Sequence, residues 1–129
     1  MKAKDYLTTG VTCAVIQKDK VFQAHTSGIQ PLLDWLKEEV CPLTNGDVAD
    51  RVVGKAAALL FRYANIRSLY AEVISEHAIQ ALENSGIAVS YGTRVPYIIN
   101  RRHDGMCPME SLVLDETDPK RAYERLKQK

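Results

Sequence analysis

Residues 47–78, DVADRVVGKAAALLFRYANIRSLYAEVISEHA, carry the pattern on which the predicted fold is built. The stretch 48–64 is apolar nearly all round and rich in alanine, which is typical of a helix in the middle of a domain, and Asp47 can cap it. Residues 68–75, SLYAEVIS, predict a strand that follows this helix. The stretch 76–86 predicts a helix that Gly86 closes. Helix, strand and helix follow one another directly.

The flanking segments extend this alternation in both directions. Upstream, the apolar stretches 11–17 and 21–25 enclose a polar break and predict a β-hairpin. A helix is expected at 29–40, with Pro31 in its first turn. Downstream, a strand is expected at 87–91, an extended segment at 95–100, a short helix at 107–114 that begins with Pro108, and a last helix capped by Asp118.

Strands that alternate with helices are usually parallel and joined by right-handed crossovers, whereas the opening hairpin is antiparallel. We therefore predict an α/β fold, a three-layer α/β/α mixed sheet with helices on both faces. All 129 residues are expected to form a single domain, with a core at about 11–115 and a C-terminal helix at 118–128. In such sheets, ligand pockets lie beyond the carboxyl ends of strands, beside helix N-termini.

Composition and charge exclude several classes of protein. The chain has 17 basic and 16 acidic residues, so it lacks the excess of positive charge that nucleic-acid or anionic-membrane binding requires. No apolar run approaches the roughly 18 residues of a membrane span, and no signal peptide is recognisable, so a cytoplasmic location is expected. Cys13, Cys41 and Cys107 are odd in number and form no CxxC, which indicates free thiols.

The order of elements resembles the cytidine deaminase-like fold, whose zinc enzymes carry H-x-E on a central helix and P-C-x-x-C at a later strand-to-helix junction. When VGKAAAL (53–59) is laid on the first motif, Val53 takes the histidine position and Lys55 the glutamate position. When ISEHA (74–78) is laid on the second, Ser75 and Ala78 take the cysteine positions. Val53 and Ala78 cannot donate an electron pair to zinc, so neither a metal nor another cofactor is expected.

The chain also resembles a family of uncharacterised bacterial and archaeal domains assigned to this superfamily without the zinc motifs. The segments that carry this resemblance are ADRVVGKAAALL (49–60), VISEHA (73–78), VPYIINRR (95–102) and GMCPME (105–110). The resemblance covers about residues 11–115 and implies the fold, with no established activity. It also implies a nucleobase, nucleoside or nucleotide-like ligand, and a homodimer assembled through helices.

Cys107 is the first candidate for chemistry. Because Pro108 begins a predicted helix, Cys107 falls at its cap, where the helix dipole and the three cations at 101–103 would lower the pKa of the thiol. Glu110, three residues later, can reach back to the cap or contact a ligand. Cys107 is therefore a catalytic nucleophile, a ligand-contacting or redox-sensitive thiol, or a structural cap.

Lys55 and Asp50 are the other catalytic candidates. Lys55 interrupts the apolar pattern of a predicted helix. If its ammonium is buried, it must be paired or must have a lowered pKa. Otherwise its side chain extends to the rim of the buried face and reaches solvent. Asp47, Asp50 and Gly54 lie at helical spacing near the positive end of the predicted central helix. Asp50 can extend the cap or serve a polar site, and Gly54 leaves room for a ligand.

Two strand ends supply candidate ligand contacts. Ser75 and Glu76 lie where a strand gives way to a helix, and the free N–H groups of such a helix can receive an anion. Ser75 is also the natural N-cap. Asn100 and Arg101 end an apolar segment, and an arginine there is suited to grip a carboxylate or phosphate.

Two functions remain open on these residues. The first is a domain that binds a small metabolite in a cleft at helix N-termini, through Gly54, Ser75, Glu76, Asn100, Arg101 and Glu110. The second is a metal-independent enzyme that uses Cys107 or Lys55 together with Asp50 and Arg101. Binding is preferred because no pair of residues in the sequence requires a chemical step.

Overall fold

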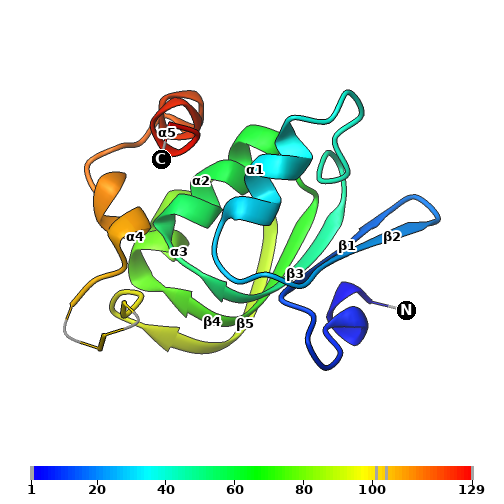
Figure 1. Cartoon of the computed structure of the whole chain (residues 1–129), viewed down its shortest axis with the longest axis horizontal. Coiled ribbons are helices and arrows are strands. Elements are labelled where there is room, and N and C mark those ends of the chain that lie inside the picture. The colour runs from blue at the N-terminus through cyan, green and yellow to red at the C-terminus, as the bar shows by residue number, and fades with distance from the viewer. Residues whose placement is uncertain (1, 101, 104, 129) are drawn as a thin grey trace.

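The computed structural model describes residues 2–100, 102–103 and 105–128. It contains a mixed sheet, covered by helices (Figure 1). The elements in chain order are η1 (Ala3–Tyr6), β1 (Cys13–Gln17), β2 (Lys20–Ala24), α1 (Gln30–Leu36), β3 (Asp47–Val53), α2 (Lys55–Ala64), β4 (Ser68–Ser75), α3 (Glu76–Leu82), β5 (Ala88–Val95), α4 (Pro108–Leu112) and α5 (Pro119–Leu126).

The sheet has five strands in the order β2-β1-β3-β4-β5. Strand β1 pairs antiparallel with both β2 and β3, whereas β3, β4 and β5 are parallel. The prediction of a mixed α/β fold with an opening hairpin is therefore confirmed. The predicted strand at 68–75 is confirmed with the same bounds, and the strand that begins near residue 88 continues to Val95.

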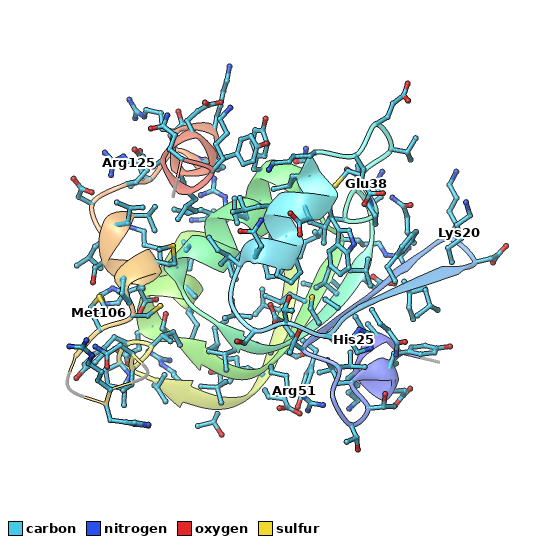
Figure 2. All side chains as sticks on the ribbon, viewed as in Figure 1. Lys20, His25, Glu38, Arg51, Met106 and Arg125 are labelled. Atoms are coloured by element: carbon cyan, nitrogen blue, oxygen red, sulfur yellow. The ribbon has the colours of Figure 1, made fainter. Side chains whose placement is uncertain are left out.

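The five α-helices of the described residues lie on one side of the sheet (Figure 1), and α2 contacts each of the other four. Among the described residues, the opposite side carries η1, which packs against β1 and β3. On that side the guanidinium of Arg51 donates to the carbonyl oxygens of Leu7, Thr8 and Val11 (Figure 2). The chain crosses from β2 to β3, from β3 to β4 and from β4 to β5, each time in the same direction across the sheet. Right-handed crossovers that all move in one direction place their helices on the same face of the sheet. The predicted covering of both faces by helices is therefore wrong for the described residues.

The largest correction concerns the predicted helix at 48–64. Its first half is strand β3, and only its second half, from Lys55 onwards, is helical. Gly54 separates the two halves as the N-cap of α2, with extended backbone at φ −98° and ψ −176°. A central strand and a buried helix are both apolar on most sides, so hydrophobic periodicity does not tell them apart.

Two predicted roles change with this correction. Asp47 begins a strand instead of capping a helix, and its carboxylate accepts hydrogen bonds from Arg67 and Ser68. The hydrogen bonds of the Arg67 guanidinium hold the pKa of Asp47 below its usual value. Asp47, Asp50 and Gly54 do not share a helix face. Instead, Asp50 lies in β3 and Gly54 follows its end.

Helix α2 lies at the centre of the core. Its residues from Ala56 to Phe61 are all buried, between the sheet and the surrounding helices. Burial of a leucine or phenylalanine side chain contributes about 1.5–3 kcal/mol, so this helix anchors the fold. Ala122 and Leu126 of α5 belong to the same cluster. None of the described helices has the length and apolar character needed to cross a membrane.

Candidate functional site

A pocket of about 880 Å³ opens beyond the carboxyl end of β3, next to the first turn of α2. This is the position that the sequence predicts for a ligand pocket. Its walls are residues 27–29 before α1, Asp50 and Val52 of β3, Gly54, Ala56 and Ala57, residues 98–100, Arg102, and residues 107–110. The lining is largely apolar, so the few polar groups in it determine what can bind.

Asp50 is the polar group that stands out in this pocket. It lies in β3 opposite Cys13 of β1 and Ala71 of β4. Burial raises the pKa of Asp50 to about 7, although the backbone N–H groups of Arg51 and Val52 oppose the shift. Burial, and to a smaller extent the charge of Asp50, also raises the pKa of the Cys13 thiol. The Asp50 carboxyl can therefore gain or lose a proton close to neutral pH.

Glu110 of α4 is a buried carboxylate with only 1% of its surface exposed. Its Oε2 atom accepts hydrogen bonds from the backbone N–H of Lys55 and from the hydroxyl of Ser75, each at 2.6 Å. Its Oε1 atom accepts from the backbone N–H of Ile98 at 2.8 Å. One side chain thus joins the start of α2, the start of α3 and the segment that follows β5. A carboxylate is favoured there because the N-terminus of a helix carries partial positive charge.

Gly54 is explained by the same carboxylate. A Cβ atom at position 54 would lie 2.9 Å from Glu110 Oε2 and 2.9 Å from Ile98 Cγ1, closer than van der Waals contact allows. Glycine at the N-cap lets the Glu110 carboxylate reach the backbone N–H of Lys55. The room that the sequence suggested for a ligand at Gly54 is partly filled by this carboxylate, although Gly54 still lines the pocket.

Ser75 is the N-cap of α3, as predicted, and its Oγ atom accepts a hydrogen bond of 3.0 Å from the N–H of Ala78. Because Oγ also donates to Glu110, the buried hydroxyl is engaged on both sides. Ser75 does not line the pocket. Glu76 does not line the pocket either. Its carboxylate forms an ion pair of 3.4 Å with Arg94 of β5 near the surface.

Cys107 is the N-cap residue of α4, as the sequence predicts, and it lines the pocket. Its backbone N–H donates to the carbonyl oxygen of Ile98 at 2.7 Å, and its thiol forms no capping bond. Glu110 does not reach back to this cap. Its carboxylate oxygens accept hydrogen bonds from Lys55, Ser75 and Ile98 instead, so Glu110 does not cap α4 together with Cys107.

Lys55 stands at the first position of α2, not in the interior of a helix. Its ammonium donates a hydrogen bond of 2.6 Å to the carbonyl oxygen of Leu114, and it does not line the pocket. Partial burial lowers the pKa of Lys55, while the charges of Asp115, Glu116 and Glu110 oppose the shift. The structure therefore does not bring this amine together with Asp50 and Cys107.

The segment after β5 forms the outer wall of the pocket. Asn100 and Arg102 both contribute to the lining, and Arg102 is exposed. The backbone N–H of Asn100 donates to the carbonyl oxygen of Gly105 at 2.9 Å, which closes the turn. Arg101, a predicted ligand contact, lies outside the described residues.

Sequence reasoning missed most of the apolar lining. Val52 has 49% of its surface exposed, in a strand whose other residues are buried or partly buried, whereas the sequence predicts a helix at this position. Ile98 and Met109 line the pocket from segments far from β3 in sequence. A recognisable signal was the glycine at 54 after a β-branched run, which marks the end of a strand.

In the part of the chain that the structure describes, no three side chains of the His, Cys, Asp and Glu types lie together in a way that could hold a metal ion. The acidic and thiol groups in the pocket lining are the Asp50 carboxyl, the Cys107 thiol and a Glu110 carboxylate that is already hydrogen-bonded.

Residues 2–129 match the model of a family described as "TM1506: Domain of unknown function (DUF1893)". A similar solved structure is the crystal structure, at 2.70 Å resolution, of a DUF1893 family protein (TM1506) from Thermotoga maritima. The two chains share 25% sequence identity and superpose with a TM-score of 0.85, over 97% of this chain and 84% of that chain. No curated protein matches the sequence.

Proposed function

This chain belongs to the DUF1893 family of domains of unknown function, and we propose that it binds a small metabolite in the pocket beside β3 and α2, with Asp50 recognising a hydrogen-bond donor of the ligand. The observation that carries the proposal is the position of Asp50, a carboxyl with a pKa of about 7 in a largely apolar pocket. Burying such a group is unfavourable unless a partner offsets the loss of water.

The size and lining of the pocket favour a flat, partly apolar ligand. A volume of about 880 Å³ is within the range of roughly 300–1,000 Å³ that small-molecule sites occupy. Val52 and Ile98 offer apolar surface to the faces of a ring, and Asp50 offers an acceptor to an N–H on its edge. Nucleobases and nucleosides combine these features, and the resemblance to the cytidine deaminase-like fold favours the same class.

The cytidine deaminase-like assignment, without its zinc motifs, is part of this proposal. The two segments laid on those motifs, 53–59 and 74–78, begin α2 and α3, and Glu110 bridges them through Lys55 and Ser75. Val53 and Ala78 are fully buried apolar residues there. Side chains of this kind support a site that holds its ligand through hydrogen bonds and apolar contacts instead of a metal.

A thermal-shift screen of nucleobases, nucleosides and nucleotides tests this function, since a ligand that binds only the folded state raises the melting temperature. We expect at least one of these compounds to stabilise the wild-type protein and to lose its effect in Asp50→Leu, which has a similar size but no hydrogen-bond acceptor. Asp19→Asn, an exposed aspartate in the β1–β2 turn, is the matched control and should retain the shift. A panel without any stabilising compound, or a hit that Asp50→Leu retains in full, contradicts the proposal.

A second candidate is a metal-independent enzyme, favoured by the fact that Asp50 and Cys107 line the same pocket. An acid with a pKa of about 7 is suited to general acid–base catalysis, and a thiol to nucleophilic attack. In this case Cys107 should react with iodoacetamide near neutral pH many-fold faster than free cysteine, and a bound ligand should protect it. An ordinary rate of alkylation supports binding alone.

A further inference from the structure

Strand β5 forms one edge of the sheet, and it is unusually open for a strand of its length. It extends over Ala88–Val95 and pairs with β4 on one side only. Every residue from Ala88 to Arg94 is exposed. The unpaired side therefore presents a row of backbone N–H and C=O groups to another chain.

The side chains of β5 do little to protect this edge. Proteins usually protect an edge strand with lysine, proline or a bulge, and β5 has none of these among its eight residues. Its one charged residue is Arg94, which is paired with Glu76 of the same chain. Val89 and Tyr91, on the same face, have 36% and 43% of their surface exposed.

The opposite edge of the sheet is built differently. Strand β2 has only five residues, and Lys20 begins it at the tip of the hairpin (Figure 2). Ala24, at its other end, is buried. A short strand with a lysine is a poor template for further pairing, so the two edges differ in the property that controls strand addition.

We propose that β5 pairs antiparallel with β5 of a second copy of this chain, so that two five-stranded sheets join into one continuous sheet. A two-fold axis perpendicular to the sheet makes such an interface self-complementary, because the same strand supplies both sides. This interface differs from the homodimer through helices that the resemblance implies. Most of helix α2, the most apolar helix, is buried within one chain, and Tyr63 is its one exposed large apolar residue.

The residues of β5 are complementary to themselves in this orientation. In an antiparallel pair, opposite residues share a face of the sheet, and a two-fold axis at Gly92 places Tyr91 opposite Thr93 of the second copy. The same register places Val89 opposite Val95, and Ser90 opposite Arg94. Aromatic and β-branched cross-strand pairs contribute about 0.2–1 kcal/mol each. No like charges lie directly opposite one another, so charge does not oppose the pairing.

Sedimentation velocity over a range of concentrations tests the interface. We expect the wild-type protein to sediment as a species with twice the mass of one chain, which is 14.4 kDa. The double variant Val89→Lys/Tyr91→Lys should sediment as a monomer of 14.4 kDa. Its far-UV circular dichroism spectrum should be unchanged, because both side chains are exposed in the single chain. The matched control is Val21→Lys on β2, where 40% of the residue is exposed, and it should remain dimeric.

Several results would overturn the proposal: a monomeric wild-type protein at every concentration, a dimeric double variant, or a Val21→Lys variant that dissociates. Should the double variant fail to fold, hydrogen exchange of the wild-type protein decides the question. Half of the β5 amides point away from β4, and these should exchange slowly at dimer-forming concentrations. Fast exchange of the same amides contradicts the interface.

Discussion

The Oε2 atom of Glu110 lies 2.6 Å from the backbone nitrogen of Lys55, a residue 55 positions earlier in the chain. This contact fixes α4, and with it the outer wall of the pocket, to the first turn of α2. The same carboxylate accepts hydrogen bonds from the Ser75 hydroxyl and the backbone N–H of Ile98, so a single side chain joins α4 to the start of α2, the start of α3 and the segment after β5.

Replacement of Glu110 should therefore destabilise the protein strongly. Glu110→Ala removes every acceptor of this network and leaves buried donors unpaired, which we expect to cost about 3–5 kcal/mol in the free energy of unfolding. Glu110→Gln keeps one oxygen and should cost less, about 1–3 kcal/mol. Urea unfolding measures both values. Glu38→Gln at an exposed position after α1 is the control, and a loss in Glu110→Ala no larger than in this control would contradict the structural role.

Gly54→Ala should also destabilise the protein, because its Cβ would meet Glu110 Oε2 and Ile98 Cγ1 at 2.9 Å. The neighbouring side chains must shift, and overpacking of this kind costs about 1–3 kcal/mol. Gly105→Ala is the comparison, since the nearest atom to its Cβ is 3.8 Å away, at Asn100 Nδ2. Equal stability of the two variants in urea unfolding would show that the close approach at Gly54 is not required.

The stability of the protein should depend on the protonation of Asp50. The folded chain keeps the Asp50 proton up to about pH 7, whereas an unfolded aspartic acid loses it near its ordinary pKa of 3.8. The folded state thus holds more protons between these values, so this group lowers the free energy of unfolding as the pH rises through that window. Asp50→Asn cannot ionise. The free energy of unfolding of Asp50→Asn, relative to that of the wild type, should therefore increase from about pH 4 to about pH 8, by at most about 4 kcal/mol.

Urea unfolding of both proteins across this pH range gives that difference directly. A ¹³C NMR titration of the Asp50 carboxyl provides an independent measurement, with a midpoint expected near 7. A midpoint near the ordinary value for aspartate, together with parallel stability curves, would remove the physical basis for Asp50 as the recognition group.

The three thiols should differ in their reaction with iodoacetamide. Cys13 is buried in β1, and burial raises its pKa, so the folded protein should leave it unmodified. Cys107 and Cys41 are both partly exposed and should be alkylated first. Mass spectrometry of peptides after timed labelling gives each rate, and Cys13 labelling at the rate of Cys41 would contradict the packing of β1 against β3.

Local signals made parts of the fold predictable from the sequence. Ser75 and Asp118 cap their helices as expected, and Pro108 begins α4, because capping depends on residues only two or three positions away. The division of 48–64 into β3 and α2 was missed, because a strand between two neighbours and a helix within a core show the same apolar pattern.

The candidate site could be predicted only in part. The sequence pattern indicates Asp50 through a helical spacing, yet Asp50 lines the pocket because it lies near the end of a strand. Cys107 was placed correctly at its cap. The partners of Glu110 could not be predicted, since they lie 55, 35 and 12 residues away in sequence, and only the folded chain brings them together.

The most direct test of the proposed ligand site is a crystal structure of the protein with the most stabilising compound from the screen. We predict that the compound occupies the pocket between β3, residues 98–100 and residues 107–110, with a donor nitrogen or oxygen within hydrogen-bond distance of the Asp50 carboxyl. A compound bound elsewhere, or one in this pocket that makes no polar contact with Asp50, would contradict it.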